Sequence, residues 1–307
     1  MALHRLTSIT IGVPDVAATA AYYEDFGLTP ARGGRFATLD GGEQLGLVAS
    51  TRRRLVELGV GVDDGDDLDW VAANLARVGA RVEREGSSVT AVDPGTHVRV
   101  VLRIAARIRQ TAPAAPATNG PGHAGRPGAR AAAVLRAGPV RPRKLGHVVL
   151  GSTDVGASER FFIEGVGFKV SDTVRGLAVF LRCSTDHHNL LIQQAPVDFL
   201  HHTSWQVDDV DEIGRGATAM LEKDPARHVW GLGRHHIGSN FFWYLKDPAG
   251  NFTEYYADLD CVLDDQLWKP GVWDGAKSLF SWGPPPPPSF IAPDDLAALM
   301  ASAHRAG

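Results

Sequence analysis

The stretch "LTSITIGVPDVAATAAYYEDFGL", from Leu6 to Leu28, recurs later in the chain as "LGHVVLGSTDVGASERFFIEGVGF", from Leu145 to Phe168. Each copy reads as a short alternating strand, an aspartate before a helix with paired aromatics, and a glycine that ends the helix. Repetition over this length indicates a fold assembled from copies of one supersecondary unit.

A second kind of unit follows each copy of the first. One begins at "LVELGVGVDDGDDLDW" and the other at "HTSWQVDDVDEIG". Both read as a strand, a helix with an acidic start, and further strands divided by an Asp-Pro turn. We therefore expect an α+β protein of four βαβββ modules. Because one such module cannot bury its sheet alone, the modules are expected to pair and to curl their strands around a shared cavity.

The segment between the two halves has a different composition. Residues 105–143 hold seven arginines and no acidic residue among alanines, prolines and glycines. Too few large apolar side chains are present to bury, which predicts a solvated connector; a basic recognition strip is the alternative. The expected organisation is an N-terminal two-module domain at 1–104, this linker at 105–143, a C-terminal domain at 144–258 and a tail at 259–307.

The tail contains five consecutive prolines, Pro284–Pro288, which predict a stiff polyproline II segment. Several tryptophans accompany the prolines, so we expect the tail to pack over its own or a neighbouring subunit. Recognition by a partner domain that binds proline-rich segments is the alternative. A short helix is expected near the end, in "PDDLAALMASAHRA".

The composition limits the classes of function. Of 307 residues, 44% are apolar and 21% charged, as in a globular protein with a substantial core. A formal net charge of −4 gives no electrostatic case for binding nucleic acid. No apolar run approaches membrane-spanning length, and the N-terminus enters a strand pattern at once, so we expect a cytoplasmic protein that does not bind membranes.

Glu254 is unusual because it interrupts an apolar and aromatic strand, "NFTEYYA". A carboxylate on the inward face of a sheet is costly unless something neutralises it. Either a cation lies beside Glu254, or the strand is an edge strand with that face in water.

Comparison of the repeats favours the cation. Three strand positions differ between the halves in the same way: Ser8 against His147, Glu57 against His202, and, after one gap at the turn, Arg99 against Glu254. A single histidine in a strand is more often an ordinary core or surface residue. Two histidines and a carboxylate at matched positions are instead typical of the facial triad of non-haem Fe(II) oxygenases.

Both halves resemble the vicinal oxygen chelate superfamily, and the C-terminal half resembles the type I extradiol (catechol meta-cleaving) dioxygenases. The resemblance covers nearly all of residues 1–258, and its chemistry lies within 145–256. It rests on "LGHVVL", on "HHTSWQV", and on a closing signature of His235, Tyr244, "DPAGNF" and Glu254. Trp243 departs from the smaller or different apolar residues that the family usually carries there.

The resemblance implies two vicinal-oxygen-chelate domains and a metal held by His147, His202 and Glu254. The metal would be Fe(II), although Mn(II) suits the same ligands. His201, the neighbour of His202, is expected to point to the opposite face of its strand. A homo-oligomer is also expected.

The resemblance further implies residues that act on the substrate. In "DHHNLL", His188 is the expected acid–base residue, with His187 as the alternative, and Asn189 departs from the family pattern. His235 and Tyr244 match residues that hydrogen-bond the reacting oxygen atoms, with His236 a weaker alternative to His235. His187, His236 and Trp205 are also candidates for substrate contact.

The implied reaction is extradiol cleavage, in which both atoms of O₂ enter a catecholic ring next to its diol and give a muconic semialdehyde-type product. Two alternatives remain: a metal-dependent glyoxalase-like isomerase or transferase, and a ligand-binding protein of the bleomycin-resistance type. Aromatic residues near the signature favour an apolar or aryl-bearing catechol but are equally consistent with core positions: Trp205, Phe241, Phe242 and Trp243.

Overall fold

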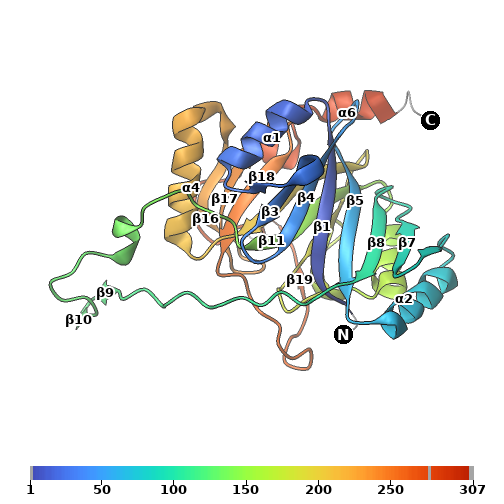
Figure 1. Cartoon of the computed structure of the whole chain (residues 1–307), viewed down its shortest axis with the longest axis horizontal. Helices are drawn as coiled ribbons and strands as arrows, with labels where there is room; N and C mark the ends of the chain where they lie inside the picture. Colours follow the sequence, from blue (N-terminus) through green and yellow to red (C-terminus); the bar gives the residue numbers. More distant parts are fainter. Residues whose placement is uncertain (1–2, 276–277, 304–307) are drawn as a thin grey trace.

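The computed structural model describes residues 3–275 and 278–303. Two large mixed sheets form its centre (Figure 1), with strand orders β2-β3-β4-β1-β5-β8-β7-β6 and β16-β17-β18-β15-β11-β14-β13-β12-β19. The N-terminal sheet comprises β1 (Leu3–Val13), β2 (Thr29–Pro30), β3 (Arg35–Thr38), β4 (Gly42–Ala49), β5 (Arg54–Val62), β6 (Glu83–Glu85), β7 (Ser88–Val92) and β8 (Arg99–Ile104). The C-terminal sheet comprises β11 (Lys144–Ser152), β12 (Lys169–Val174), β13 (Ala178–Arg182), β14 (Leu190–Gln194), β15 (Phe199–Gln206), β16 (His228–Arg234), β17 (Phe241–Lys246), β18 (Phe252–Ala257) and β19 (Gly271–Trp273).

One helix belongs to each of the four modules. These are α1 (Val16–Asp25), α2 (Gly65–Arg77), α3 (Val155–Arg160), which continues into the π-helical η3 (Phe161–Val166), and α4 (Val210–Lys223). Each begins after an aspartate whose carboxylate accepts a hydrogen bond from a backbone N–H in the first turn: Asp15, Asp64, Asp154 and Asp209. The four-module α+β prediction is confirmed.

The two sheets share one pairing scheme. In the N-terminal sheet β1 runs parallel to β4 and antiparallel to β5, and β5 runs parallel to β8. The same relations join β11 to β14 and β15, and β15 to β18. Positions on these four strands of one half therefore have definite counterparts in the other.

This register corrects one predicted equivalence. Glu254 pairs with Ser204, which pairs with His147. In the N-terminal sheet Ser8 pairs with Gly59, and Gly59 pairs with Val101. The equivalent pairs are therefore His147 and Ser8, His202 and Glu57, and Glu254 and Val101 rather than Arg99. The alignment was wrong at Arg99 because the N-terminal turn, residues 93–98, is one residue longer than the C-terminal turn, residues 247–251, not shorter.

Helix α1 packs on the sheet of the opposite half, against β18 (Figure 1). Tyr22 shares a hydrogen bond with Thr253, and the ring of Phe26 stacks on that of Tyr255 at a centroid distance of 3.9 Å. The Tyr255 hydroxyl also donates to the carbonyl of Phe26 at 2.6 Å. Because these side chains are fully buried, the two halves share one core.

The segment at 105–143 follows an extended path to the short hairpin of β9 (Asn119–Gly120) and β10 (His123–Ala124), as Figure 1 shows. Most of its side chains are exposed. Its arginines do not form a continuous strip, because three of them pair with separate acidic groups: Arg107 with Asp63, Arg136 with Asp209 and Arg143 with Asp40.

The tail packs on its own chain. β19 adds to the C-terminal sheet beside β12, so this sheet extends beyond residue 258. The short helix α5 (Pro288–Ile291) buries Phe290, and α6 (Leu296–Ala303) is the terminal helix expected from the sequence. Within the described residues, no helix is long and apolar enough to cross a membrane.

Candidate metal centre

Glu254 lies in the interior of the C-terminal sheet. Its strand, β18, is hydrogen-bonded to β15 on one side and to β17 on the other, and its side chain is fully buried. The edge-strand explanation is therefore wrong. Among the described residues, Glu254 Oε2 has no hydrogen-bond donor. A buried carboxylate oxygen without a donor is strongly unfavourable, which favours a cation at this position.

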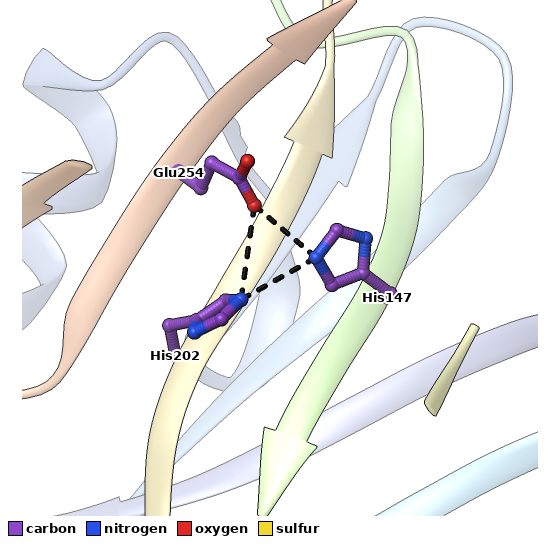
Figure 2. A group of neighbouring side chains, drawn as sticks. All are labelled: His147, His202 and Glu254. Carbon is purple, nitrogen blue, oxygen red and sulfur yellow. Dashed lines mark hydrogen bonds and ion pairs between the residues drawn. The ribbon is translucent and has the colours of Figure 1, made fainter. Parts of the chain in front are cut away.

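Two histidines face the same oxygen from neighbouring strands (Figure 2). Glu254 Oε2 lies 3.1 Å from His147 Nε2 and 3.7 Å from His202 Nε2. The two Nε2 atoms lie 3.4 Å apart. Thus β11, β15 and β18 each direct one metal-donor atom to a common point.

The three donors fit a single first-row metal ion. Ligand atoms bound about 2.1 Å from one ion, at right angles to each other, are separated by about 3.0 Å. The observed separations of 3.1, 3.4 and 3.7 Å are close to that value before any adjustment on binding. Two imidazoles and one carboxylate on one face leave the other positions of the ion for substrates.

His147 and His202 line a cavity of about 80 Å³. Besides these two metal ligands, its wall contains three further predicted site residues, His188, His235 and Tyr244. The rest of the wall is largely apolar and comes partly from the tail: Val149, Phe180, Leu191, Ile237, Leu279 and Phe290.

Comparisons with known proteins agree with this geometry. The model of the Glyoxalase/Bleomycin resistance protein/Dioxygenase superfamily matches residues 144–255. Metapyrocatechase 2 of Cupriavidus necator is 31% identical over 303 residues, which cover 94% of this chain and 92% of that protein. This chain is a type I extradiol dioxygenase. The iron-dependent extradiol dioxygenase of Rhodococcus jostii is 30% identical over 139 residues, covering 40% of this chain and 46% of that protein.

A solved structure shows how widely the fold is shared. The Mn(II)-bound glyoxalase from Novosphingobium aromaticivorans superposes with a TM-score of 0.75 at 24% identity, covering 93% of each chain. At this identity the likeness establishes the fold alone. The dioxygenase therefore has the two-domain architecture of its superfamily, and its metal is held by His147, His202 and Glu254.

The two adjacent histidines of the dioxygenase at 187 and 188 have different surroundings. His188 lines the cavity, and its ring centroid lies 4.1 Å from that of His147. His187 lies behind it, with Nδ1 3.0 Å from His188 Nδ1 and Nε2 3.0 Å from Asp172 Oδ2. Burial, reinforced by the neighbouring histidines, holds the pKa of His188 well below its usual value.

His235 and Tyr244 form a second polar group on the cavity wall. The Tyr244 hydroxyl lies 2.9 Å from His235 Nε2, and His235 Nδ1 donates to the carbonyl of Leu279 at 2.6 Å. Because Nδ1 carries the proton of a neutral ring, Nε2 accepts from the tyrosine. Burial raises the pKa of Tyr244 well above its usual value, so Tyr244 keeps its proton at neutral pH.

Asn240 completes the surroundings of the carboxylate. Its Nδ2 donates to Glu254 Oε1 at 3.1 Å, which leaves Oε2 as the free oxygen. The sequence analysis missed this residue. Asn240 lies in the connection between β16 and β17, where an asparagine is ordinary turn chemistry, so the sequence carries no signal for it.

Two candidates for substrate contact lie away from the cavity. His236 follows the end of β16, is exposed, and packs on the ring of Trp273. Trp205 is buried, donates through Nε1 to Thr203 Oγ1, and packs on Tyr23 of α1. Side chains alternate along β15, so Trp205 faces the shared core while His202 faces the cavity. Neither residue is retained in the predicted site.

The predicted orientation of His201 is also wrong. Opposite β11, the pairing passes from Val149–His202 to Leu150–Leu200, so His201 sits in a β-bulge. The bulge interrupts the alternation of side chains. As a result His201 lines the same cavity as His202, and the two Nδ1 atoms lie 2.8 Å apart.

Proposed function

We propose that the enzyme opens a single-ring catechol next to its two hydroxyls and gives a muconic semialdehyde-type product. The observation that carries this proposal is a metal triad whose two histidines line a cavity together with His188, His235 and Tyr244. When bound, the metal brings substrate and O₂ together and supplies the redox path between them. Fe(II) is the proposed ion because the donor set suits it; Mn(II) suits the same ligands.

We propose that His188 takes the proton of a substrate hydroxyl. A carboxylate accepts and does not donate, so the hydrogen bond to Asp172 uses the Nε2 proton of His187. His187 Nδ1 then accepts from His188 Nδ1. This direction of hydrogen bonds leaves His188 Nε2 without a proton and free to act as a base. His187 supports His188 from behind and is not itself the proposed base.

We propose that Tyr244 turns its hydroxyl proton from His235 Nε2 toward negative charge that develops on oxygen during the reaction, and that His235 holds the hydroxyl in place until then. A buried phenol that keeps its proton is a hydrogen-bond donor, and a donor aimed at developing charge lowers the barrier in a site without bulk water. The 2.9 Å contact with His235 holds the Tyr244 hydroxyl at the cavity wall.

The size and lining of the cavity limit the proposed substrate. Pockets for drug-sized ligands usually measure about 300–1,000 Å³, and this cavity measures about 80 Å³. Apart from the histidines, most of its lining side chains are apolar. We therefore propose an unsubstituted or small alkyl-substituted catechol and place a biphenyl-type substrate second.

The test is an anaerobic incubation of Fe(II)-loaded protein with catechol, methylcatechols and 2,3-dihydroxybiphenyl, followed by admission of air. We expect a yellow product and one O₂ consumed per ring, with alkylcatechols turned over faster than the biphenyl. The control His147→Ala should do neither. Metal-loaded protein that consumes no oxygen across this panel would overturn the proposal and favour a glyoxalase-like isomerase, whose fold this chain shares.

We also propose a division of roles within the chain. Residues 1–104 would support the catalytic half at 144–258 through the shared core, and 105–143 would connect them. Limited proteolysis within 105–143 should leave ring cleavage intact, because neither the metal ligands nor the cavity wall lie there.

Two predictions concern the setting of the enzyme. The homo-oligomer is supported by two highly exposed leucines in the tail, Leu263 and Leu267, at 85% and 82% exposure. Light scattering of the wild type and of a Leu263→Asp, Leu267→Asp variant tests it. The cytoplasmic location remains a prediction that cell fractionation tests.

A further inference from the structure

His201 links the metal ligand His202 to the C-terminal tail. One ring nitrogen of His201, Nδ1, lies 2.8 Å from His202 Nδ1. The other, Nε2, lies 2.6 Å from the backbone carbonyl oxygen of Phe290 in α5. The chain of contacts therefore runs from the tail through one imidazole to the imidazole that binds the metal.

The direction of each hydrogen bond follows from elementary donor and acceptor rules. A carbonyl oxygen only accepts, so the proton of neutral His201 lies on Nε2. A metal ligand needs a lone pair, so the proton of His202 lies on Nδ1 when Nε2 binds the metal. His202 Nδ1 then donates to His201 Nδ1, and both contacts are satisfied with uncharged rings. With both histidines neutral, no other arrangement of the protons keeps both hydrogen bonds and leaves His202 Nε2 free to bind the metal.

The tail segment is held firmly at this point. The Phe290 ring is buried and lies 4.7 Å from that of Tyr244 and 4.8 Å from that of Trp230 by centroid distance. The Trp230 indole also donates to the carbonyl of Pro284 at 2.7 Å. Phe290 itself forms part of the cavity wall. The same segment thus forms part of the cavity wall and accepts the hydrogen bond that fixes the tautomer of His201.

We propose that His201 is a positioning residue that couples docking of residues 288–291 to metal binding by His202. The inference rests on the metal centre and not on the identity of the substrate. With the tail docked, His201 presents an acceptor to His202 and fixes the ring with Nε2 toward the metal. With the tail displaced, His201 loses the Phe290 carbonyl that holds its proton on Nε2. The ring of the metal ligand His202 then has no fixed acceptor and becomes free to rotate. Hydrogen bonds of this kind to ligating histidines typically change metal affinity by about 10–100-fold.

The test measures the Kd for Mn(II) without oxygen by competition with a chromophoric chelator, in a double-mutant cycle. The two changes are His201→Asn and a truncation after Pro287. Asparagine keeps an acceptor near the Nδ1 position but does not reach Phe290. We expect truncation to weaken metal binding about tenfold in the wild type and to have no effect in His201→Asn. His201→Phe, which removes the acceptor, should bind about 10–100-fold more weakly than the wild type.

A matched variant in the same tail separates this effect from general loosening. Leu299 of α6 packs in a cluster with Ala195, Val197 and Phe199 that contains no histidine, so Leu299→Ala should leave the Kd for Mn(II) unchanged. Because truncation could disturb folding, Phe290→Gly in the full chain repeats the test with a smaller change. The proposal fails if truncation weakens binding equally in the wild type and in His201→Asn, or if His201→Phe binds as the wild type does. A failure of ring cleavage with normal metal coupling would instead count against the proposed function alone.

Discussion

The N-terminal and C-terminal sheets have the same strand order around their centres, but one row of positions differs. In the C-terminal sheet the row carries His147 and Glu254, and Glu254 keeps one oxygen free. In the N-terminal sheet the corresponding positions are Ser8 and Val101. Glu57, an acidic residue of the N-terminal sheet, occupies the place of His202 and forms ion pairs with two arginines of the neighbouring strand β8.

The comparison shows that the fold provides the same facing strand positions in both sheets. The side chains at those positions determine whether they bind a metal. Glu57 is neutralised by Arg99 at 2.6 Å and by Arg103 at 3.4 Å, so its charge needs no ion. Glu254 is buried beside two imidazoles, which can be uncharged, and one asparagine amide. Only the second arrangement leaves a binding position for a metal.

The largest effect is expected when a metal ligand of the C-terminal sheet is replaced by the residue that occupies the equivalent position in the N-terminal sheet. Glu254→Val should abolish metal binding and lower ring cleavage by about 10³-fold or more, because the metal supplies several kcal/mol of activation. The metal-free variant should be about 1–4 kcal/mol more stable than the metal-free wild type, since an unpaired buried carboxylate is replaced by an apolar side chain. Metal content and chemical denaturation measure the two effects.

Val101→Ala is the matched control for this variant. It changes the equivalent position of the other sheet and should leave metal content unchanged. If Glu254→Val instead keeps its metal, or if its metal-free form is less stable than the wild type, the carboxylate is held by interactions other than an ion.

The next effect concerns stabilisation by the metal. At a free Mn(II) concentration of 1,000 times Kd, the free energy of unfolding should rise by about 4.1 kcal/mol, because the ion binds the folded protein. Denaturation with and without metal measures this increase. It should vanish in His147→Ser, which carries the N-terminal counterpart, and persist in Glu57→Gln. An equal increase in His147→Ser would place the stabilising ion elsewhere.

The metal ligands could be predicted from the sequence because their residue types are rare in apolar strands and recur at matched places. The helix starts could be predicted for a similar reason, since Asp15 and Asp154 each precede a helix of the same kind. Both signals depend on the residue types and their repeated positions, which can be read from the sequence without knowing how the strands pair.

Two errors in prediction involve backbone register. Arg99 was matched to Glu254 because a one-residue difference in turn length is invisible before the strands are paired. His201 was assigned to the wrong face because a β-bulge breaks alternation without a clear sequence mark. Asn240 and Phe290 reach the centre from a turn and from the tail, so no spacing along the chain relates them to the ligands.

A smaller effect is expected at the two Asp-Pro turns, which occupy equivalent places in the sheets. Burial raises the pKa of Asp247 to about 6, although Asn251 opposes the shift by donating hydrogen bonds. The folded state therefore binds this proton more strongly than the unfolded chain. The stabilising contribution is complete below pH about 4 and is lost as the pH rises through about 6, up to about 3 kcal/mol.

Asp247→Asn tests this sign. The difference in unfolding free energy between the wild type and the variant should move in favour of the variant from pH 4 to pH 7, as measured by denaturation at several pH values. Burial also raises the pKa of Asp93 in the equivalent turn, so Asp93→Asn should show the same direction. A difference that is flat with pH, or that favours the wild type as pH rises, would contradict the assignment.

The smallest effect is expected at the N-terminal row itself. The Arg99 side chain is 46% exposed and that of Glu57 is 23% exposed, so solvent screens their ion pair and its contribution should be only about 0.2–1 kcal/mol. A double-mutant cycle of Glu57→Gln and Arg99→Leu, measured by denaturation at low and high salt, gives this coupling, which should shrink with salt. Metal affinity should be unchanged in all three variants. A coupling of several kcal/mol, or a change in metal affinity, would mean that the N-terminal row supports the metal centre and does not merely share its geometry.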